Sequence, residues 1–364
     1  MNGRNGGYPS ARIMVIGVGG GGGNAITRMK QAGIKDVDMI AVNTDAQVLD
    51  IVKADRTLQI GEELTHGLGA GGDPEIGRKA AQESKDAISD MLDDADMVFV
   101  TCGMGGGTGT GAAPIIASMA KEKGILTTGI VTKPFSFEGK TRAEKAEMGI
   151  EALSENVDTI ITISNDKLLK VAPENIPITQ AFELADEILK QGVQGISDLI
   201  TVPGMINLDF ADIRSAMKDA GSAIMGIGEG ESNGKTQEAA RNAISSPLLE
   251  GSITGARNVI LNISGNSDLS LEEVTEAASV IQESVSDDAN IIFGTTIEEE
   301  MEFVRLTVIA TGFTRSLNEG EEGSVPEDQI YRQMEQQSEE SKTEKDNKSN
   351  NNNNLDVPTF LRRT

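Results

Sequence analysis

A run of glycines and threonines in the first third of the chain has the composition of a phosphate-binding loop. Apolar runs at 97–100 and 112–117 flank it, and it consists of Gly105-Gly106-Gly107-Thr108-Gly109-Thr110-Gly111. Because glycine has no Cβ, the backbone N–H groups of such a loop can approach a ligand closely, and threonine hydroxyls add further donors. The N-terminus of a helix that begins inside the loop favours an anion at the same place. We therefore predict a phosphate site here rather than an empty turn.

Two more glycine-rich segments follow apolar runs in the same half of the chain. The turn expected at 17–24 contains Gly20, Gly21, Gly22, Gly23 and Asn24, and the turn expected at 69–74 contains Ala70 and Gly71. Between them, an apolar strand at 38–42 ends in Asn43, and Asp45 follows two residues later. A single glycine turn with an acidic residue about twenty positions beyond it is also typical of a Rossmann unit that binds NAD. An NAD-dependent oxidoreductase is therefore an open alternative at this point, although three such turns favour another phosphate ligand.

These segments belong to a chain in which apolar runs and helical patterns alternate. Strands predicted at 11–18, 38–42, 97–100, 125–131 and 159–163 are separated by helical or glycine-rich stretches, which predicts an α/β fold with a mainly parallel sheet. Such sheets bind ligands beyond the carboxyl ends of their strands, where all three glycine segments lie. A second, smaller α/β domain is expected after 203, with strands near 223–228, 258–263, 290–295 and 302–312.

The longest helical pattern, at 177–202, connects the two predicted domains. Its apolar residues recur at steps of three and four, and Pro177 and Pro203 lie at its ends. Gly192 and Gly195 should pack closely against a neighbouring element. Phe182 and Asp186 are four residues apart and share a face, and a carboxylate suits guanine, which offers two adjacent N–H donors. Phe182 alone would more simply be a core residue.

Acidic residues follow this helix directly. Asn207 or Asp209 could cap the next helix, expected at about 210–219, but capping explains one carboxylate and leaves Asp212 without a role. No phosphate turn lies nearby in the sequence, which is consistent with a catalytic site that a second molecule completes. The segment 316–354 is polar and is predicted to be disordered, and 355–364 regains apolar and basic residues, as docking peptides do.

Composition excludes several classes of function. The formal charge of −25 argues against nucleic-acid partners and against direct binding to anionic membranes. No apolar run approaches the roughly twenty residues of a membrane helix, so a cytosolic protein is expected. With one cysteine, Cys102, and one histidine, His66, the chain has no set of residues for a zinc site or a Ser-His-Asp triad. Catalysis would have to use carboxylates, a ligand-borne metal ion and backbone donors.

The run at 105–111 resembles the signature loop of the tubulin family, and the chain from about 11 to 315, together with 355–364, resembles the bacterial cell-division GTPases of the tubulin/FtsZ family. Residues 1–10 are polar and glycine-rich and are expected to be flexible. The resemblance implies a Rossmann-like GTP-binding domain at 11–176, a central helix at 177–202 and a GTPase-activating domain at 203–315. It implies GTP or GDP with Mg²⁺ as ligands. The residues implied to contact the nucleotide are Gly20, Gly21, Gly22, Gly23, Asn24, Asn43, Ala70, Gly71, Gly105, Gly106, Gly107, Thr108, Gly109, Thr110, Glu138, Arg142, Asn165, Phe182 and Asp186.

The family polymerises head to tail, and the resemblance implies that Asn207, Asp209 and Asp212 act on the nucleotide of the next subunit. It further implies a filament at the mid-cell division ring in the cytoplasm. Adaptor and regulatory proteins would bind 355–364, so that any membrane contact is indirect. An NAD-dependent oxidoreductase and a nucleotide-binding scaffold without catalysis are the two alternatives.

Overall fold

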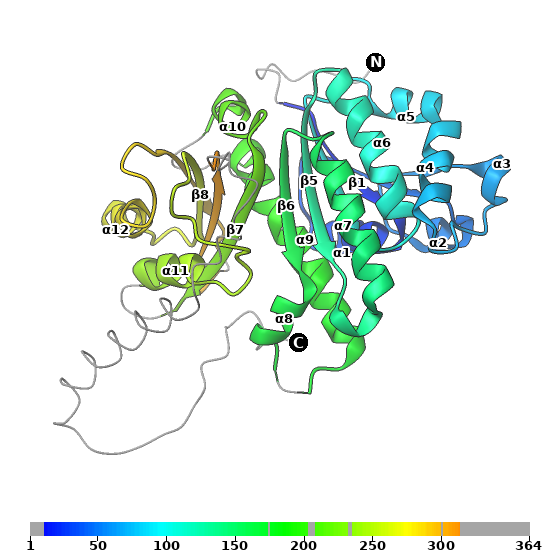
Figure 1. Ribbon diagram of the computed structural model, residues 1–364. Helices are drawn as coiled ribbons and strands as arrows, with labels where there is room; N and C mark the ends of the chain where they lie inside the picture. Colours follow the sequence, from blue (N-terminus) through cyan, green and yellow to red (C-terminus); the bar gives the residue numbers. More distant parts are fainter. Residues whose placement is uncertain (1–10, 174, 203–207, 232–234, 300, 314–364) are drawn as a thin grey trace, which may run out of the picture. The chain divides into compact units, whose positions relative to one another are not determined.

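The computed structural model describes residues 11–173, 175–202, 208–231, 235–299 and 301–313. The predictions for 1–10, for Asn207 and for the segments beyond 313 lie outside the described residues. Within the described chain, strands and helices alternate as predicted (Figure 1).

The first half of the chain contains six strands, which helices or turns separate. Its elements are β1 (Ile13–Val18), α1 (Gly19–Gln31), β2 (Val37–Asn43), α2 (Ala46–Ile51), β3 (Arg56–Gln59), α3 (Glu62–Thr65), α4 (Pro74–Glu83), α5 (Lys85–Leu92), β4 (Met97–Gly103), α6 (Thr108–Glu122), β5 (Leu126–Lys133), a 3-10 turn (Ser136–Glu138), α7 (Lys140–Ser154), β6 (Thr159–Ser164) and α8 (Asn165–Val171).

The second half begins with the long helix predicted from the sequence. Its elements are α9 (Ile178–Thr201), α10 (Phe210–Met217), β7 (Gly221–Gly230), α11 (Lys235–Ile244), β8 (Asn258–Gly265), α12 (Leu271–Gln282), β9 (Asn290–Ile297) and β10 (Val304–Thr311). The helix α9 has 24 residues and is therefore about 36 Å long.

The described strands form one sheet in the order β3-β2-β1-β4-β5-β6-β7-β10-β8-β9. All pairs from β3 to β7 are parallel, β10 is antiparallel to both of its neighbours, and β8 and β9 are parallel. The smaller α/β region is therefore continuous with the first, because β7 pairs with β6 from Thr159↔Gly221 to Ile161↔Ala223.

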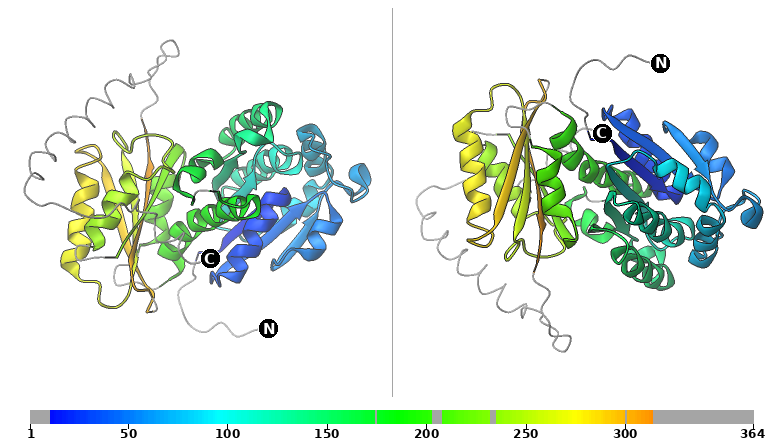
Figure 2. Two further views of the ribbon diagram at one scale, coloured as in Figure 1. Left: turned by 90° about the horizontal axis from the view of Figure 1, so that it is seen from below. Right: turned by 90° about the horizontal axis from the view of Figure 1, so that it is seen from above.

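Alternating strand residues face two helical layers. In β1, Ile13 and Val15 pack with α1 and α9, whereas Met14 and Ile16 pack with α4, α5 and α6. A third cluster joins α11 and α12 to β8 and β10. The first cluster also contains residues of β7, β8 and β10, so α9 packs on strands of both regions and runs between them in Figures 1 and 2.

Two glycines allow α9 to lie close to these strands, as expected. A Cβ added to Gly192 would lie 3.2 Å from Ile130 Cγ2, and one added to Gly195 would lie 2.8 Å from Thr307 Cγ2. The small residues thus set the distance between α9 and the strands β5 and β10.

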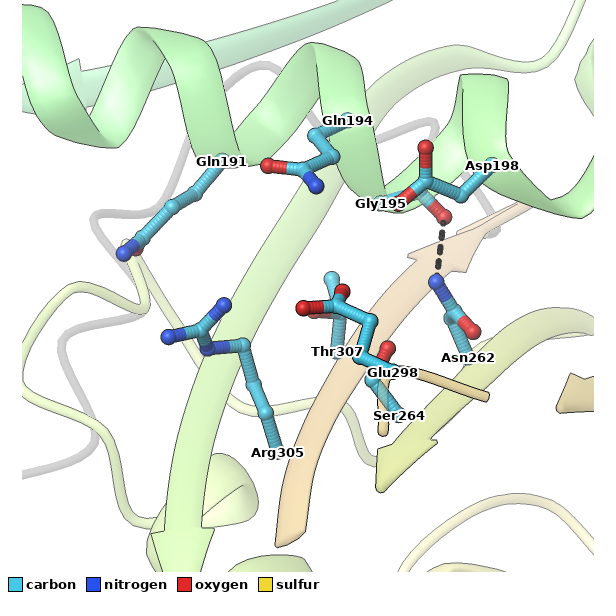
Figure 3. A pocket seen from close by; sticks show the side chains of 9 residues that line it. All are labelled: Gln191, Gln194, Gly195, Asp198, Asn262, Ser264, Glu298, Arg305 and Thr307. Carbon is cyan, nitrogen blue, oxygen red and sulfur yellow. Dashed lines mark hydrogen bonds between the residues drawn. The ribbon is translucent and has the colours of Figure 1, made fainter. Parts of the chain in front are cut away.

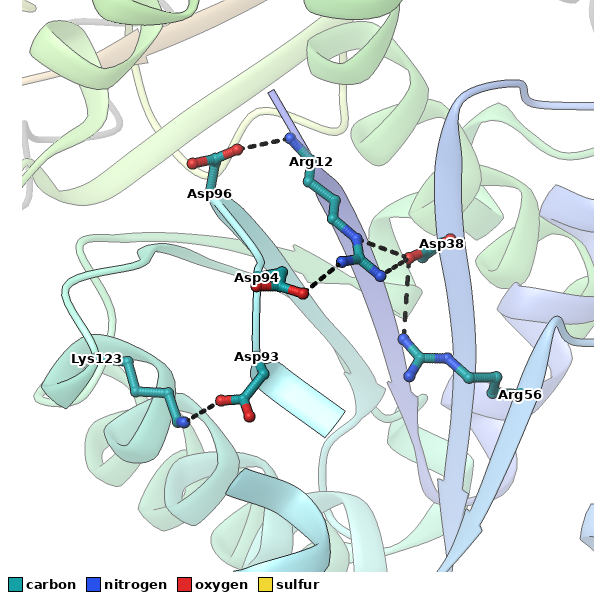
Figure 4. Close-up of polar contacts among 7 residues, drawn as sticks. All are labelled: Arg12, Asp38, Arg56, Asp93, Asp94, Asp96 and Lys123. Atoms are coloured by element: carbon teal, nitrogen blue, oxygen red, sulfur yellow. Dashed lines mark hydrogen bonds and ion pairs between the residues drawn. The ribbon is translucent and has the colours of Figure 1, made fainter. Parts of the chain in front are cut away.

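The amino edge of the sheet carries a network of ion pairs (Figure 4). The Arg12 guanidinium lies 3.3 Å from Asp38 and 3.2 Å from Asp94, and its backbone N–H donates to Asp96. Lys123 pairs with Asp93 at 2.6 Å. Such exposed ion pairs contribute at most about 1 kcal/mol each to the stability of the fold. We therefore interpret this network as contacts between the strand ends and not as a catalytic site.

The glycine turn expected at 17–24 was wrong in part, because α1 already begins at Gly19. The glycines within this helix have two different surroundings. A Cβ on Gly22 would lie 2.6 Å from both the Gly17 carbonyl carbon and the Thr101 carbonyl oxygen. A Cβ on Gly20 would have no atom within 4 Å. Of these two glycines, Gly22 is required by the packing of α1 on the sheet and Gly20 is not.

We predict that Gly22→Ala lowers the free energy of unfolding by about 1–3 kcal/mol or more, because the methyl group meets backbone atoms that cannot move independently. The Gly20→Ala variant is the matched control and should unfold like the unaltered chain. Chemical denaturation of both variants without ligand checks the difference. Equal losses in the two variants would contradict this account of α1 packing.

Candidate functional site

The three glycine segments meet at the carboxyl edge of the parallel sheet. A Cβ on Gly19 would lie 2.9 Å from the backbone nitrogen of Gly109, and one on Gly21 would lie 3.2 Å from that of Gly103. The start of α1 therefore lies directly against the loop between β4 and α6. Gly23 is buried in the second turn of α1, and Asn24 is exposed beside it.

The segment 69–73 forms a tight turn that packs on the same loop. The Asp73 N–H donates to the Ala70 carbonyl at 3.0 Å, and both central residues, Gly71 and Gly72, have positive φ values of 58° and 73°. Only glycine adopts two such conformations in succession at low cost. Ala70 is buried, and a Cβ on Gly107 would meet its Cβ at 2.8 Å.

The threonines of the glycine loop shape it from within. Thr110 Oγ1 accepts a hydrogen bond from the Gly105 N–H at 2.9 Å, and Thr108 Oγ1 lies 2.7 Å from Thr44 Oγ1. The side chain of Asn43 accepts from the Thr44 N–H at 2.8 Å and so fixes the turn after β2. Burial raises the pKa of the Cys102 thiol to about 12, which makes this residue a core residue and not a nucleophile.

At two of these positions the fold itself does not require glycine. A Cβ on Gly20 or Gly106 would have no atom within 4 Å, and neither residue has a positive φ. Alanine would fit at both positions in the described structure. The space above them is therefore suited to a ligand that approaches the backbone closely.

Aromatic rings lie beside this edge of the sheet. Phe182, in the first turns of α9, makes edge-to-face contacts with Phe135 at 5.3 Å and with Phe137 at 6.3 Å. Its relative exposure is 39%, so the interpretation of Phe182 as a simple core residue is wrong. A half-exposed ring held by two others can stack on a planar ligand.

Asp186 lies one turn further along α9, and its carboxylate pairs with Arg28 of α1 at 3.4 Å. Its side chain is only 13% exposed. Burial raises the pKa of Asp186 to about 6, and the nearby Arg28 guanidinium only partly opposes this effect. Sequence reasoning missed Arg28, although its position one helical turn after Asn24 places both residues on the same face of α1.

Glu138 and Arg142 link the rings to the glycine loop. Glu138 accepts from the Phe135 N–H at 2.9 Å and pairs with Arg142 at 3.1 Å. A Cβ on Gly105 would lie 2.6 Å from the Arg142 carbonyl oxygen, so the start of α7 lies against the loop. Asn165 follows β6 and is buried, and its Oδ1 atom has no hydrogen-bond partner among the described residues. An unpaired buried oxygen is costly unless a ligand satisfies it.

The predicted catalytic acids lie at the opposite edge. Asp209 and Asp212 are exposed at the start of α10, and the side chain of Asp209 makes no capping hydrogen bond. The Arg214 side chain donates to the Gly124 carbonyl at 3.1 Å, which places α10 beside the amino end of β5. An eight-residue strand is about 25 Å long. The acids therefore cannot reach the glycine loops of their own chain.

A separate small cavity of about 10 Å³ lies between α9 and β8–β10 (Figure 3). Asp198 of α9 lines it together with Glu298 and Arg305, and Asn262 donates to the Gly195 carbonyl at 3.4 Å across it. Burial raises the pKa of Asp198 to about 7, and the Glu298 carboxylate adds to this increase. Gln194, Arg305 and Lys190 partly oppose it.

No group of three or more histidine, cysteine or acidic side chains in the described part of the chain could hold a metal ion. No helix among the described residues is long and apolar enough to cross a membrane. Glycine-rich loops at the carboxyl edge of a mainly parallel sheet are typical of α/β nucleotide-binding proteins.

Comparisons with known proteins identify the family. Residues 12–173 match the GTPase domain of the tubulin/FtsZ family, and residues 221–314 match the C-terminal domain of the FtsZ family. FtsZ from M. jannaschii, solved as an empty dimer, is 46% identical, with 84% of this chain and 89% of that chain covered and a TM-score of 0.81. The chain therefore belongs to the tubulin/FtsZ family and is a tubulin-like GTPase.

More distant structures share the fold. CetZ2 from Haloferax volcanii, solved as a GTPγS-bound protofilament, is 21% identical, covers 91% of this chain and 99% of its own, and has a TM-score of 0.71. CetZ1 from the same organism, solved as a GDP-bound monomer, is 22% identical. The match covers 90% of this chain and 99% of CetZ1, with a TM-score of 0.71.

Asp198 gives a prediction for stability. Because its pKa is about 7 in the folded chain and near 3.8 when unfolded, the folded state binds more protons between these values. Ionisation of the buried Asp198 carboxylate therefore destabilises the folded chain increasingly as the pH rises from about 4 to 7. At pH 8 the free energy of unfolding of the Asp198→Asn variant should be about 2–4 kcal/mol higher than that of the unaltered chain. Near pH 4 the two values should be almost equal.

Urea unfolding at several pH values measures this difference. Asp36→Asn is the matched control, because Asp36 is exposed and asparagine tolerates its positive φ of 57°. The control should leave the pH dependence unchanged. An equal increase in the free energy of unfolding of Asp198→Asn at pH 4 and pH 8 would contradict a raised pKa of Asp198 in the folded chain.

Proposed function

We propose that this GTPase binds GTP at the carboxyl edge of its sheet and hydrolyses it within head-to-tail filaments. The observation that carries the proposal is the open space above Gly20 and Gly106, where glycine has no structural purpose unless a ligand lies on the backbone. Backbone amides and the N-terminus of α6 suit phosphate oxygens at this position. The match to the GTPase domain of the tubulin/FtsZ family supports GTP as the nucleotide and hydrolysis as the reaction.

The nucleoside is proposed to lie across α9 and the loop after β5. Phe182 would stack on guanine and Asp186 would accept its two adjacent N–H donors. Asn165, with its unpaired buried oxygen, and Glu138 and Arg142 would contact the sugar and the first phosphates. The remaining phosphate contacts are assigned to Gly20–Asn24, Asn43, Ala70, Gly71 and Gly105–Thr110.

Mg²⁺ is proposed to arrive with the nucleotide, since no described cluster of acidic residues could hold it. When bound with the nucleotide, Mg²⁺ would neutralise phosphate charge during transfer. The chain itself would orient the phosphates through the backbone amides of its glycine loops.

Catalysis is proposed to need a second subunit. Asp209 and Asp212, with Asn207, would orient the attacking water in the site of the next molecule, because a strand length of about 25 Å separates them from their own glycine loops. Stacking subunits head to tail brings the amino edge of one sheet to the carboxyl edge of the next. The dimer of M. jannaschii FtsZ and the protofilament of Haloferax volcanii CetZ2 support such self-association.

At the level of the cell, we propose that the filaments form the bacterial division ring at mid-cell in the cytoplasm. In this scheme residues 11–176 bind the nucleotide, the helix at 177–202 connects the regions, and residues 203–315 activate the neighbouring site. The segment 316–354 would be a linker, and division adaptor and regulatory proteins would bind 355–364. Contact with the membrane would then occur only through such adaptors, and nucleic acid has no part in the scheme.

We predict that selectivity for GTP over ATP depends on ionised Asp186. Asp186→Ala should lose about tenfold or more in GTP affinity and little in ATP affinity, because a charged acceptor for guanine is removed. Since burial raises the pKa of Asp186 to about 6, GTP affinity of the unaltered chain should fall as the pH decreases through this value. Asp186→Ala should lack this dependence.

Titration of each nucleotide into protein at pH 5.5 and 7.5 measures both effects. Glu183→Ala is the control, because Glu183 also pairs with Arg28 but is 52% exposed. This variant should retain nucleotide selectivity. Unchanged discrimination in Asp186→Ala would remove Asp186 from the base site.

A second prediction concerns catalysis between subunits. Asp212→Ala should bind GTP normally and lose hydrolysis, because the phosphate loops remain while the group that orients water is absent. Gly107→Trp should block the phosphate loop, where even a Cβ would lie 2.8 Å from Ala70 Cβ, and leave its own acids intact. Mixing the two variants should restore part of the phosphate release, measured in a steady-state assay.

Dilution of the unaltered chain is the independent test. Its turnover per subunit should decrease steeply below the concentration at which light scattering detects filaments. Full turnover by monomers would place all catalytic groups within one chain and refute the role of Asp209 and Asp212.

A further inference from the structure

The turn Ala70–Asp73 is held at its ends, and among the described residues a single hydrogen-bonded contact from outside the turn reaches its tip. The Gly69 N–H donates to the Thr44 carbonyl at 3.2 Å, Ala70 is buried, and the Asp73 side chain accepts from the Glu75 N–H at 2.9 Å. At the tip, no atom lies within 4 Å of a Cβ added to Gly71 or Gly72. Among the described residues, neither of their amides has a hydrogen-bond acceptor.

That single contact comes from Lys145 of α7. Its Nζ atom donates to the Gly72 carbonyl oxygen at 2.6 Å. The same helix packs on the glycine loop, because a Cβ on Gly149 would lie 2.4 Å from Thr110 Cγ2. The helix α7 therefore joins the turn to the loop between β4 and α6.

The ammonium group of Lys145 has no carboxylate within ion-pair distance in the described part of the chain. Other cations near it have carboxylate partners: Lys140 pairs with Glu144, Arg142 with Glu138 and Lys133 with Glu147. Lys145 has no ion pair among the described residues, although the whole chain has a formal charge of −25. An unpaired ammonium group beside two free amides creates a local positive field.

The position of the turn indicates which part of the nucleotide it would meet. The base site lies at Phe182, which contacts Phe135, and the contacts continue through Glu138 and Arg142 to Gly105. The turn packs on the far part of the same loop, at Gly107. A nucleotide that follows this series of contacts has its last phosphate nearest the turn.

We propose that Lys145 is a positioning residue for the terminal phosphate of a nucleoside triphosphate. By holding the Gly72 carbonyl, its ammonium group keeps the amides of Gly71 and Gly72 free and directed to the third phosphate. This inference rests on the proposed function, because it assumes that GTP occupies the carboxyl edge.

The experiment compares GTPγS with GDP, which lacks the third phosphate, at protein concentrations too low for filaments. Lys145→Met should weaken GTPγS binding about tenfold and GDP binding less than about twofold, since only the amides that meet the last phosphate lose their support. Lys145→Arg keeps a charged donor and should restore most of the affinity. Lys140→Met removes a charge from an exposed residue of the same helix and should resemble the unaltered chain.

The outcomes separate the inference from the proposed function. Equal losses for the two nucleotides in Lys145→Met, or no loss for either, would overturn the role of Lys145 while leaving the site intact. Failure of Lys145→Arg to recover selectivity would overturn it as well. If the unaltered chain bound neither nucleotide, the proposed function itself would fail. Thermal melting without nucleotide should be the same for all four proteins.

Discussion

When neighbouring strands run parallel, every connection must cross a face of the sheet, so the segments that follow the strands gather at one edge. The strands β3, β2, β1, β4, β5 and β6 are paired in this way. Three glycine segments that are far apart in the sequence thereby become neighbours. The close approach of Gly19 to Gly109 and of Gly107 to Ala70 is a consequence of this pairing. Without it, no combination of glycines would form a continuous surface for a phosphate chain.

The same constraint separates the loops from the acids of α10. Since α10 lies beside the amino end of β5, the chain has its glycine loops at one edge of the sheet and Asp209 and Asp212 at the other. A molecule built in this way has two unlike ends. Unlike ends that complement each other give open, head-to-tail chains and not closed dimers. Under the proposed function, hydrolysis is then coupled to assembly by geometry alone.

The main features of the fold could be predicted from the sequence because they depend on local patterns. The strand at 97–100, the glycine loop and the helix after it each have distinct compositions, and the helix at 177–202 has a long, regular apolar period. Short elements without such patterns, including β3 with its exposed first residues Arg56 and Thr57, were not predicted.

The site was harder to predict where residues act through tertiary contacts. Phe182 would be a core residue by its type, and its half-exposed position depends on Phe135 and Phe137, which no sequence period brings together with it. Arg28 and Lys145 are ordinary helix cations in the sequence. They gain significance only because α1 lies against α9, and α7 against the glycine loop. The glycine turn at 17–24 was wrong in part for a similar reason, since packing of Gly22 on the sheet permits a helix of glycines.

The long helix α9 carries two buried acids whose surroundings differ. Asp186 has Arg28 as an ion-pair partner, whereas Asp198 has no ion pair in the described chain and lies near Glu298. Burying a carboxylate without a cation costs stability, and an uncharged residue at 198 would avoid that cost. The cavity beside Asp198 lies between α9 and the strands β8 and β10, and Asn262 donates across it to the Gly195 carbonyl. Phe182 and Asp186 lie toward the N-terminus of the same helix. The helix α9 therefore carries both the acid that lines this polar cavity and the groups that the proposed function assigns to the base.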